Sequence, residues 1–404
     1  MDKLPLEGIR VTDFTAIWAG AHITQWLGVM GADVIKIESN LRPDGTRVSW
    51  RPGRNPNSTI TAEFACLNYG KKACTLNMTL PKARELAKEL IAVSDVVAEN
   101  FGGAVMDRWG MGYADLVKIK PDIIMYSGSG FGRTGPYKEL PAFAGIVESF
   151  GGLLSLNGYP GGEPSPMCTR GFADILAADH GTFAILAALY HRSRTGHGQY
   201  IDLSMSQVVT AVIPEAVIDY TMNGRVRGPQ GNHDSTMAPH GCYRCRGDDE
   251  WVTIAVSGDD DWRAFCDAIG NPEWTADARF RDGVNRRRNQ DELDRLVQEW
   301  TRNHTHHEAT EKLQRAGVMA VATVNVAQGV RDRHLNARGF FKDMDYPGEG
   351  NLRLAGMPWR LSDVPDGNYQ RPPALGEHND YVFKELLKMS DEEIARLQEE
   401  EVIY

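Results

Sequence analysis

The chain has 404 residues, with 44 Lys or Arg against 54 Asp or Glu, so its formal net charge at pH 7 is −10. This acidic balance excludes the broad basic surface of a nucleic-acid-binding or membrane-surface protein, so a phosphate-rich ligand would need a local cluster of cations. Apolar residues at 42% and charged residues at 24% are typical of a globular protein and argue against disorder.

Three further signals predict a soluble, cytoplasmic protein. The sequence has no run of about 18 apolar residues that would span a bilayer. Its first ten residues lack the apolar region of a secretory leader. The six cysteines fit reduced thiols better than a disulfide framework.

The N-terminal part of the chain alternates strand and helix patterns. Helices are predicted over 20–30 and 81–93, and strands over 9–14, 33–37, 95–98 and 123–127. Strands that alternate with helices of about ten or more residues indicate βαβ units and a mostly parallel sheet. Ligands of such a sheet bind beyond the carboxyl ends of its strands.

The middle and the end of the chain are less regular. Glycine, proline and serine predict loops over 128–170, and the aperiodic segment 225–240 indicates a linker. Between these loops and this linker we predict a helix at 175–192, a strand at 199–203 and a helix near 206–223. A second unit is predicted from strands 251–256 and 319–324 with helices 260–269, 290–302 and 307–316, followed by a loop at 345–376 and a charged helix at 379–400.

Two motifs resemble ligand sites, and both have a plainer interpretation. Residues 130–135 spell Gly-Phe-Gly-Arg-Thr-Gly after a predicted strand, but no helix opens at the last glycine, so we expect a tight turn beside a ligand rather than a dinucleotide loop. Cys242 and Cys245 lie near His233 and His240, but the second ligand pair of a structural zinc site is missing. We therefore expect no metal.

Asp174 is the acidic residue with the strongest chemical potential. It stands at the start of the long predicted helix, where a carboxylate commonly caps the first N–H groups. A carboxylate at a helix N-terminus beside a glycine-rich loop can also be a nucleophile toward an acyl group, because those N–H groups steady negative charge. Both interpretations stay open on spacing alone. Asp179 lies about 140° further around the helix, so we interpret it as structural.

A group of cations lies near the expected carboxyl edge of the sheet and could hold a phosphate-rich ligand. Its members are Lys36, Arg42, Arg47, Lys71, Lys72 and Arg108.

Four segments, in consistent order and spacing, resemble the class III CoA-transferase family. They are Leu-Glu-Gly-Ile-Arg-Val-Thr-Asp-Phe-Thr from residue 6, Gly-Ala-Asp-Val-Ile-Lys-Ile-Glu from residue 31, Glu-Asn-Phe at 99–101 with Arg108, and Thr-Gly-His-Gly-Gln at 195–199. The family includes formyl-CoA, carnitine-type and benzylsuccinate CoA-transferases, with α-methylacyl-CoA racemase as a divergent member.

The resemblance implies an α/β fold with two domains, a Rossmann-like large domain with a mostly parallel sheet and a smaller α/β domain. Two long linkers would join these domains, and two chains would form an interlocked dimer. On this chain the large domain would cover 1–224, the first linker 225–240 and the small domain 241–326. Residues 327–404 would form the second linker and a C-terminal segment that returns to the large domain.

The resemblance also implies a mechanism and its residues. Asp174 would attack an acyl-CoA to form an aspartyl anhydride and then an aspartyl-CoA thioester, from which an acceptor acid collects CoA. Coenzyme A is then a substrate, and no tightly bound cofactor is expected. The CoA contacts map onto Ile17, Trp18, Ala19, Arg42 or Arg47, Lys71, Lys72, Asn100, Phe101 and Arg108, and the acyl pocket onto Gly130, Phe131 and Phe143.

Departures from the family pattern narrow the activity. Ala16 and Trp18 replace the His and Gln of formyl-CoA transferase, which argues against formate or oxalate and leaves a bulky, aromatic or dicarboxylic acid. Residues 141–145 contain no His where the racemase carries one of its two bases, so transfer is favoured over racemisation. The alternatives are an acyl-CoA racemase or epimerase and a CoA-binding subunit of a heteromeric transferase. The expected partners are an acyl-CoA, a carboxylic acid and a second copy or a paralogous subunit, without nucleic acid or membrane.

Overall fold

The computed structural model describes residues 3–48, 60–165 and 171–404. The chain divides into two compact units. The first comprises Met1–Leu154, Pro166–Val226 and Phe340–Tyr404, and the second comprises Ser155–Ser165 and Arg227–Gly339. The second unit spans residues 241–326, for which a small domain is predicted, and also residues 227–240 of the segment predicted as a linker.

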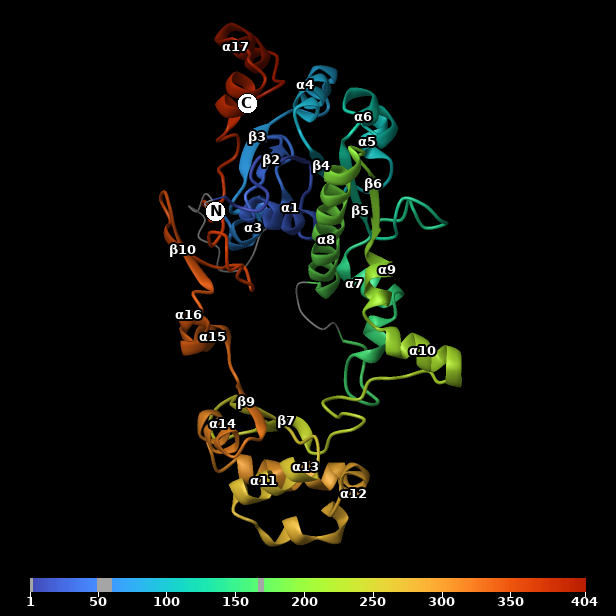
Figure 1. Ribbon diagram of the computed structural model, residues 1–404, viewed down its shortest axis with the longest axis vertical. Helices are drawn as coiled ribbons and strands as arrows, with labels where there is room; N and C mark the ends of the chain where they lie inside the picture. Colours follow the sequence, from blue (N-terminus) through green and yellow to red (C-terminus); the bar gives the residue numbers. More distant parts are fainter. Residues whose placement is uncertain (1–2, 49–59, 166–170) are drawn as a thin grey trace. The chain divides into compact units, whose positions relative to one another are not determined.

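The first unit is built on a six-stranded sheet in which every pairing is parallel (Figure 1). The strand order is β3-β2-β1-β4-β5-β6, a doubly wound arrangement whose order reverses between β1 and β4. The α/β fold class is thereby confirmed. The strands are β1 Arg10–Asp13, β2 Asp33–Glu38, β3 Lys72–Thr75, β4 Val96–Glu99, β5 Ile124–Ser129 and β6 Tyr200–Ser204.

Helices cover both faces of this sheet. Successive strand side chains point to opposite faces, so Val96 and Ala98 pack with α1 (Ala19–Val29) and α8 (Phe172–Thr195), whereas Val97 packs with α4 (Pro81–Ala92) and α6 (Tyr113–Ile119). Burial of apolar side chains on both faces explains why these strands are short apolar runs rather than alternating patterns.

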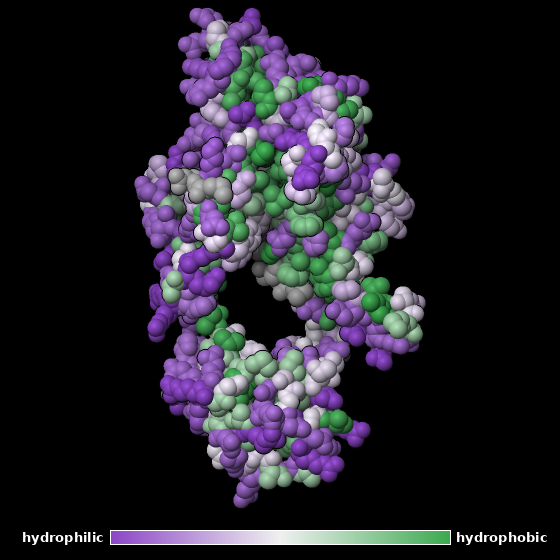
Figure 2. Space-filling view, viewed as in Figure 1, coloured by the Kyte–Doolittle hydropathy of each residue, from purple (hydrophilic) through white to green (hydrophobic). Residues whose placement is uncertain are grey.

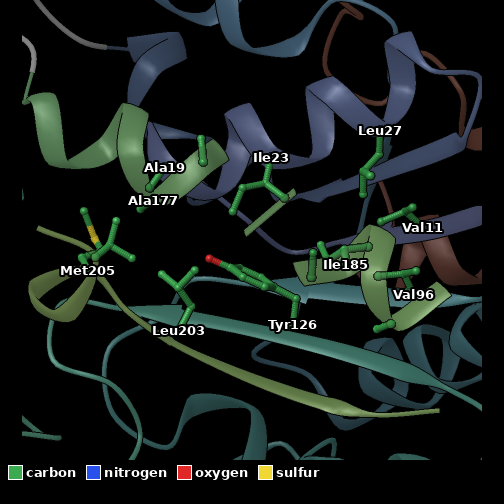
Figure 3. Packing of buried hydrophobic residues seen from close by; sticks show 14 of the residues in the cluster. Val11, Ala19, Ile23, Leu27, Val96, Tyr126, Ala177, Ile185, Leu203 and Met205 are labelled. Carbon is green, nitrogen blue, oxygen red and sulfur yellow. The ribbon is translucent and has the colours of Figure 1, made fainter. Parts of the chain in front are cut away.

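Helix α8 lies directly against α1 and β5. Figure 3 shows the Tyr126 side chain of β5 directed toward Ile23 of α1. A Cβ on Gly181 of α8 would lie 2.5 Å from Ile23 Cδ1 and 3.0 Å from Tyr126 Cε2, so this glycine permits the close approach. By length and composition α8 could cross a membrane, in contrast to the prediction that no segment is apolar enough, but core helices of soluble proteins pass the same test.

Several elements of the first unit differ from the sequence-based prediction. Strand β3 and helices α6 and α7 (Ala144–Phe150) were not predicted, and α7 lies inside the segment expected to be loop. The single helix expected near 206–223 is two helices, α9 (Met205–Ala211) and α10 (Pro214–Asn223), because proline lacks the N–H that would continue α9. The remaining short helices are α2 Gly45–Val48, α3 Ala62–Asn68, α5 Val105–Arg108 and η1 Leu153–Leu156.

The C-terminal residues belong to the first unit. Strands β10 (Phe341–Tyr346) and β11 (Gly350–Ala355) pair as an antiparallel hairpin, so the loop predicted at 345–376 is wrong over its first part. The helix predicted at 379–400 is interrupted, because η4 (Tyr381–Leu386) ends before a capping box at Ser390 starts α17 (Asp391–Glu399). Both pieces pack on the α4 side of the sheet.

The second unit has its own core. Its antiparallel sheet follows the order β7-β8-β9, and helices pack against Val252 and Ile254 of the central strand. The strands are β7 His240–Arg244, β8 Trp251–Ala255 and β9 Met319–Thr323. The helices are α11 Asp259–Ile269, η2 Glu273–Ala276, η3 Ala278–Phe280, α12 Gly283–Arg288, α13 Gln290–Thr301, α14 His306–Arg315, α15 Val326–Arg331 and α16 Arg333–Ala337.

Candidate functional site

A pocket of about 560 Å³ opens at the carboxyl ends of the first four strands. Its walls come from the segments that leave these strands, at 14–16, 37–45, 76–79 and 101–109. The pocket therefore lies at the switch point of the strand order, where doubly wound sheets bind their ligands.

Three arginines line this pocket, each from a different element. Arg42 follows β2, Arg84 lies on α4 and Arg108 ends α5. Neither Arg42 nor Arg108 forms an ion pair with any residue that the structure describes. Three guanidinium groups around one pocket suit a ligand that carries several phosphates.

Arg84 was missed by the sequence reasoning. Its Nε donates to the Met78 carbonyl at 2.9 Å and its Nη2 to the Thr79 carbonyl at 3.1 Å, so it also fastens the loop after β3. The short strand β3 was not predicted, so nothing in the sequence indicated that the next helix begins at this edge.

Two predicted contacts, Lys71 and Lys72, lie elsewhere. The fully buried Lys71 ammonium is 3.3 Å from Asp13 Oδ2 and donates to the Ala21 carbonyl at 2.7 Å. Burial lowers the pKa of Lys71 to about 8. Lys72 is the first residue of β3, so it lies at the amino ends of the strands, away from the pocket at their carboxyl ends. Its Nζ lies 2.6 Å from Asp33 Oδ1 there. Neither lysine lines the pocket.

Arg47, the alternative to Arg42, does not line the pocket itself, although its ion-pair partner Glu38 does. Its Nη2 lies 2.8 Å from Glu38 Oε2, and its guanidinium stacks on the Phe64 ring. Arg42 is therefore the member of the pair that the structure brings to the pocket wall.

A buried ion pair forms part of the pocket wall. Lys36 Nζ is 2.9 Å from Asp44 Oδ2, and both side chains are 1% exposed. Burial alone would raise the pKa of Asp44, but the Lys36 ammonium and the hydrogen bonds from Thr46 together outweigh burial and hold it at about 2. Lys36 also donates to the Thr15 carbonyl at 2.6 Å, so the pair supports the loop after β1.

This loop, residues 15–18, is held from several directions. The Asn100 amide accepts from the Ala16 N–H and donates to the Ala16 carbonyl, each at 2.9 Å. The Ile17 N–H donates to Asp44 at 3.3 Å. Ile17 has a φ of 65°, which is costly for a β-branched side chain and persists where the surroundings impose it.

The loop residues predicted to contact CoA have different surroundings. Trp18 Nε1 donates to Glu63 Oε1 at 2.7 Å, which turns the indole toward α3. Phe101 lines the pocket and meets Trp109 edge to face at 5.4 Å between ring centroids. Ile17, Trp18 and Ala19 do not line the pocket but follow its wall residue Ala16 in the chain.

Ala19 connects the loop to Asp174. Its backbone N–H begins α1 and interacts favourably with the Asp174 carboxylate in the first turn of α8, which lowers the pKa of Asp174. Burial raises the pKa of Asp174 to about 7, with the Ala19 N–H opposing the rise and the Glu148 charge reinforcing it. Two helix N-termini thus meet at one partly buried carboxyl group, an arrangement that steadies a developing negative charge.

The predicted acyl-pocket residues lie on the loop after β5 and at the start of α7. A Cβ on Gly130 would lie 2.4 Å from Ala142 Cβ, so this glycine permits a close chain crossing. Phe131 meets Phe150 edge to face at 5.2 Å, whereas Phe143 is 76% exposed in the first unit. No helix follows within residues 130–135, which form bends, and the turn lies just beyond them at 136–139.

Arg133 fastens this glycine-rich loop to the end of β4. Its guanidinium pairs with the buried carboxylate of Glu99 and donates from Nε to Ser127 Oγ at 2.6 Å. Glu99 also accepts the Phe101 N–H at 2.8 Å, so the loop is linked to the segment that lines the pocket. Among the residues described, no group of three His, Cys, Asp or Glu side chains is arranged to hold a metal.

Comparison with known proteins identifies the family. The model of CoA-transferase family III matches residues 6–379. The β subunit of succinyl-CoA–L-malate CoA-transferase from Chloroflexus aurantiacus is 34% identical over 403 residues, covering 99% of this chain and 98% of that protein. Formyl-CoA:oxalate CoA-transferase from Rhodopseudomonas palustris is 29% identical, covering 98% and 96%.

A solved structure gives the same result. A CAIB/BAIF family protein from Brucella suis superposes with a TM-score of 0.88 at 32% identity, covering 95% of this chain and all of that one. The chain therefore belongs to CoA-transferase family III and is an enzyme of the class III CoA-transferases, as the sequence motifs predicted.

Proposed function

We propose that this member of CoA-transferase family III moves coenzyme A from an acyl-CoA to a free carboxylic acid with Asp174 as the nucleophile. The observation that carries the proposal is the position of the Asp174 carboxyl group in the first turn of α8, where it is partly buried and interacts with the Ala19 N–H at the start of α1. A raised pKa near 7 leaves a carboxylate that is available at neutral pH and more basic than an exposed one.

The proposed reaction exchanges bonds at acyl carbons in four steps. An Asp174 oxygen attacks the thioester carbon, the C–S bond breaks, and CoA thiolate leaves an aspartyl anhydride. The thiolate then attacks the aspartyl carbon and expels the donor acid as a carboxylate. The acceptor carboxylate attacks this aspartyl-CoA thioester to form a second anhydride, and the released thiolate takes the acceptor acyl group. Asp174 is regenerated, and protons and electrons balance.

The proposed CoA position follows from charge and connectivity. The phosphates would lie among Arg42, Arg84 and Arg108, beside the Phe101 ring. From there the pantetheine arm would follow the loop that starts with Thr15 and Ala16 in the pocket wall and ends at the Ala19 N–H facing Asp174. Lys71 and Lys72 are not part of this proposal.

We propose a short dicarboxylic acid as the acyl group. The relative named for succinyl-CoA and L-malate matches nearly the whole chain. Trp18 stands in the first loop where formyl-CoA transferase has a polar residue, which argues against formate as the acyl group. Phe131, Tyr137 and Phe150 pack edge to face on one another, so their presence is explained without an aromatic substrate.

A second copy of this chain or a paralogous subunit is the proposed partner. Figure 2 shows apolar side chains over α8 and α10 on the face of the first unit in view. Phe183 on α8 is 74% exposed and Met222 on α10 is 76% exposed. The similar chain from C. aurantiacus is itself the β subunit of a transferase. Sedimentation of the purified chain tests this, because a stable monomer that is fully active alone would contradict it.

The experiment that tests the activity is covalent trapping. The protein is incubated with succinyl-CoA, formyl-CoA and an aromatic acyl-CoA, treated with hydroxylamine, and mapped by peptide mass spectrometry. We expect hydroxamate on the peptide that contains Asp174, strongest with succinyl-CoA, and none in Asp174→Asn. Asp179→Asn, on the same helix, is the matched control and should label like the parent.

Other outcomes would reject the proposal in distinguishable ways. Label in Asp174→Asn would reject the nucleophile, and stronger label with formyl-CoA would reject the dicarboxylic substrate. Exchange of the acyl α-proton with solvent, without any adduct, would indicate the racemase instead.

A further inference from the structure

The first turn of α8 lacks an ordinary N-cap. The cap position is Gly171, which has no side chain to accept a hydrogen bond from the first N–H groups. Gly171 has a φ of 77°, and a Cβ there would lie 2.3 Å from Ala144 Cβ. The close passage of α7 therefore excludes a serine, threonine or aspartate cap at this position.

Glu148 of α7 supplies the missing acceptor. Its Oε1 accepts the Ala173 N–H at 3.0 Å, and the side chain is 1% exposed. A buried glutamate from a neighbouring helix thus does what the N-cap side chain does in most helices. Asp174, the next residue, is relieved of that task, and its carboxylate interacts with the Ala19 N–H instead.

We infer that Glu148 is the positioning residue for the nucleophile: it caps α8 from outside, so that Asp174 stays free to react, and places a second carboxylate beside it. The inference rests on the proposed function for its catalytic consequence. Its structural part, a cap and a neighbouring charge, stands on the contacts of Glu148 alone.

The charge of Glu148 has a predictable effect on Asp174. A like charge nearby disfavours a second carboxylate, so Glu148 adds to the effect of burial and raises the pKa of Asp174, while the Ala19 N–H lowers it. Neutralising Glu148 should therefore move the ionisation of Asp174 to lower pH.

The other ionisable groups on the elements around α8 do not supply this effect. His22 of α1 is neutral at pH 7 because burial, aided by Lys71, lowers its pKa to about 4. Tyr126 of β5 is neutral because burial raises its pKa further. On β6, Asp202 accepts the Arg133 N–H and Tyr200 has a raised pKa, again through burial. Helix α9 contains no ionisable side chain.

Two substitutions separate the cap from the charge. Glu148→Gln keeps an oxygen that can accept the Ala173 N–H but removes the charge, whereas Glu148→Ala removes both. Asp179→Asn is the control for the loss of one carboxylate on α8. Each variant is compared with the parent in thermal melting, in the pH profile of kcat/KM, and in the pH dependence of carbodiimide labelling at the Asp174 peptide.

In Glu148→Gln we expect two pH values to fall together by about one unit. They are the pH of the acid limb of the kcat/KM profile and the pH midpoint of labelling at Asp174. Its kcat at high pH should stay within about threefold of the parent, since the cap is kept. Glu148→Ala should lower kcat by about 10- to 100-fold, with KM for acyl-CoA changed less than about twofold, because a misplaced nucleophile affects the chemical step.

The inference is overturned if Glu148→Gln leaves the labelling midpoint unchanged, or if folded Glu148→Ala matches Glu148→Gln in kcat. If Glu148→Ala does not fold, Glu148→Gln carries the test alone. Its labelling midpoint then tests the effect of the Glu148 charge on Asp174, and its kcat tests whether an uncharged oxygen is enough to cap α8. The labelling does not depend on turnover. A shifted midpoint with an active Asp174→Asn enzyme would therefore reject the proposed function and keep the placement of the two carboxylates.

Discussion

The side-chain amide of Asn100 exchanges two hydrogen bonds of 2.9 Å with the backbone of Ala16, one to its N–H and one to its carbonyl. These residues follow β4 and β1, the two strands between which the order of the sheet reverses. The contact joins the pocket at the carboxyl ends of the strands to the loop that leads to the Ala19 N–H beside Asp174. Under the proposed function, this asparagine links CoA binding in the pocket to the chemistry at Asp174.

Replacement of this asparagine should weaken both. In Asn100→Ala two partly buried backbone groups lose their partners, so we expect the free energy of unfolding to fall by about 1–3 kcal/mol and kcat to fall by about tenfold or more. Urea titration and steady-state kinetics measure these. Asn303→Ala, which removes one exposed hydrogen bond in the second unit, is the control. An unchanged kcat in Asn100→Ala would mean that the loop keeps its shape without the amide.

Asp174→Asn should abolish transfer, by about three orders of magnitude or more, and stabilise the fold at high pH. The pKa of Asp174 is raised to about 7 by burial, above the value of 3.8 for a free side chain, so the folded state holds an extra proton between pH 4 and 7. The parent therefore loses stability as the pH rises through this range, whereas the asparagine variant does not.

Urea titrations of the parent and of Asp174→Asn at pH 5 and pH 8 check the sign. We expect the variant to gain relative stability at pH 8, on the order of 1–3 kcal/mol. Equal stability of the two proteins at both pH values would contradict a raised pKa, and retained turnover would contradict the nucleophile.

Arg108→Ala and Arg84→Ala should raise KM for acyl-CoA by about tenfold each, because a guanidinium–phosphate contact contributes about 1.5–3 kcal/mol. The dependence of KM on salt should weaken in both variants, while kcat stays within about threefold. Lys72→Ala is the matched control, since this cation lies at the amino ends of the strands, away from the pocket at their carboxyl ends. A larger rise in KM for Lys72→Ala than for Arg108→Ala would refute the assignment of the phosphate pocket.

Lys36→Met should be among the most damaging substitutions in the first unit. It leaves the Asp44 carboxylate buried without its cation, at an expected cost of about 3–5 kcal/mol, and the double variant with Asp44→Leu should recover part of this loss. Burial would raise the pKa of Asp44, but the Lys36 ammonium and the hydrogen bonds from Thr46 lower it to about 2, so the ionised carboxylate stabilises the fold above pH 4 and this contribution is lost as the pH falls through 2.

Acid unfolding followed by circular dichroism tests this pair. The parent should show a stability loss near pH 2 that the double variant lacks. A single Lys36→Met change that costs less than about 1 kcal/mol would show that water or another group replaces the ammonium.

Much of the local structure was predictable from residue pattern. The apolar runs at β1, β2 and β5, the Pro81 start of α4 and the Gly196 end of α8 are local signals, and the structure has these elements within a few residues of the prediction. Strand β3 was not predicted because Lys-Ala-Cys-Thr is only four residues long and offers too little pattern. Without this strand in the prediction, there was no reason to place Arg84 near the ligand.

By itself, the sequence determined the α/β class, the family and the position of Asp174 at the start of a helix, because these depend on short-range periodicity, capping and motifs. Tertiary structure alone decided which cations reach the pocket and which carboxylate caps α8. Residue type does not reveal that Lys71 pairs with Asp13 inside the sheet, while Arg42 reaches the pocket. Nor does it reveal that Glu148 meets Ala173, 25 residues away. Such pairings depend on strand order and helix packing, which bring distant residues together only in the folded chain.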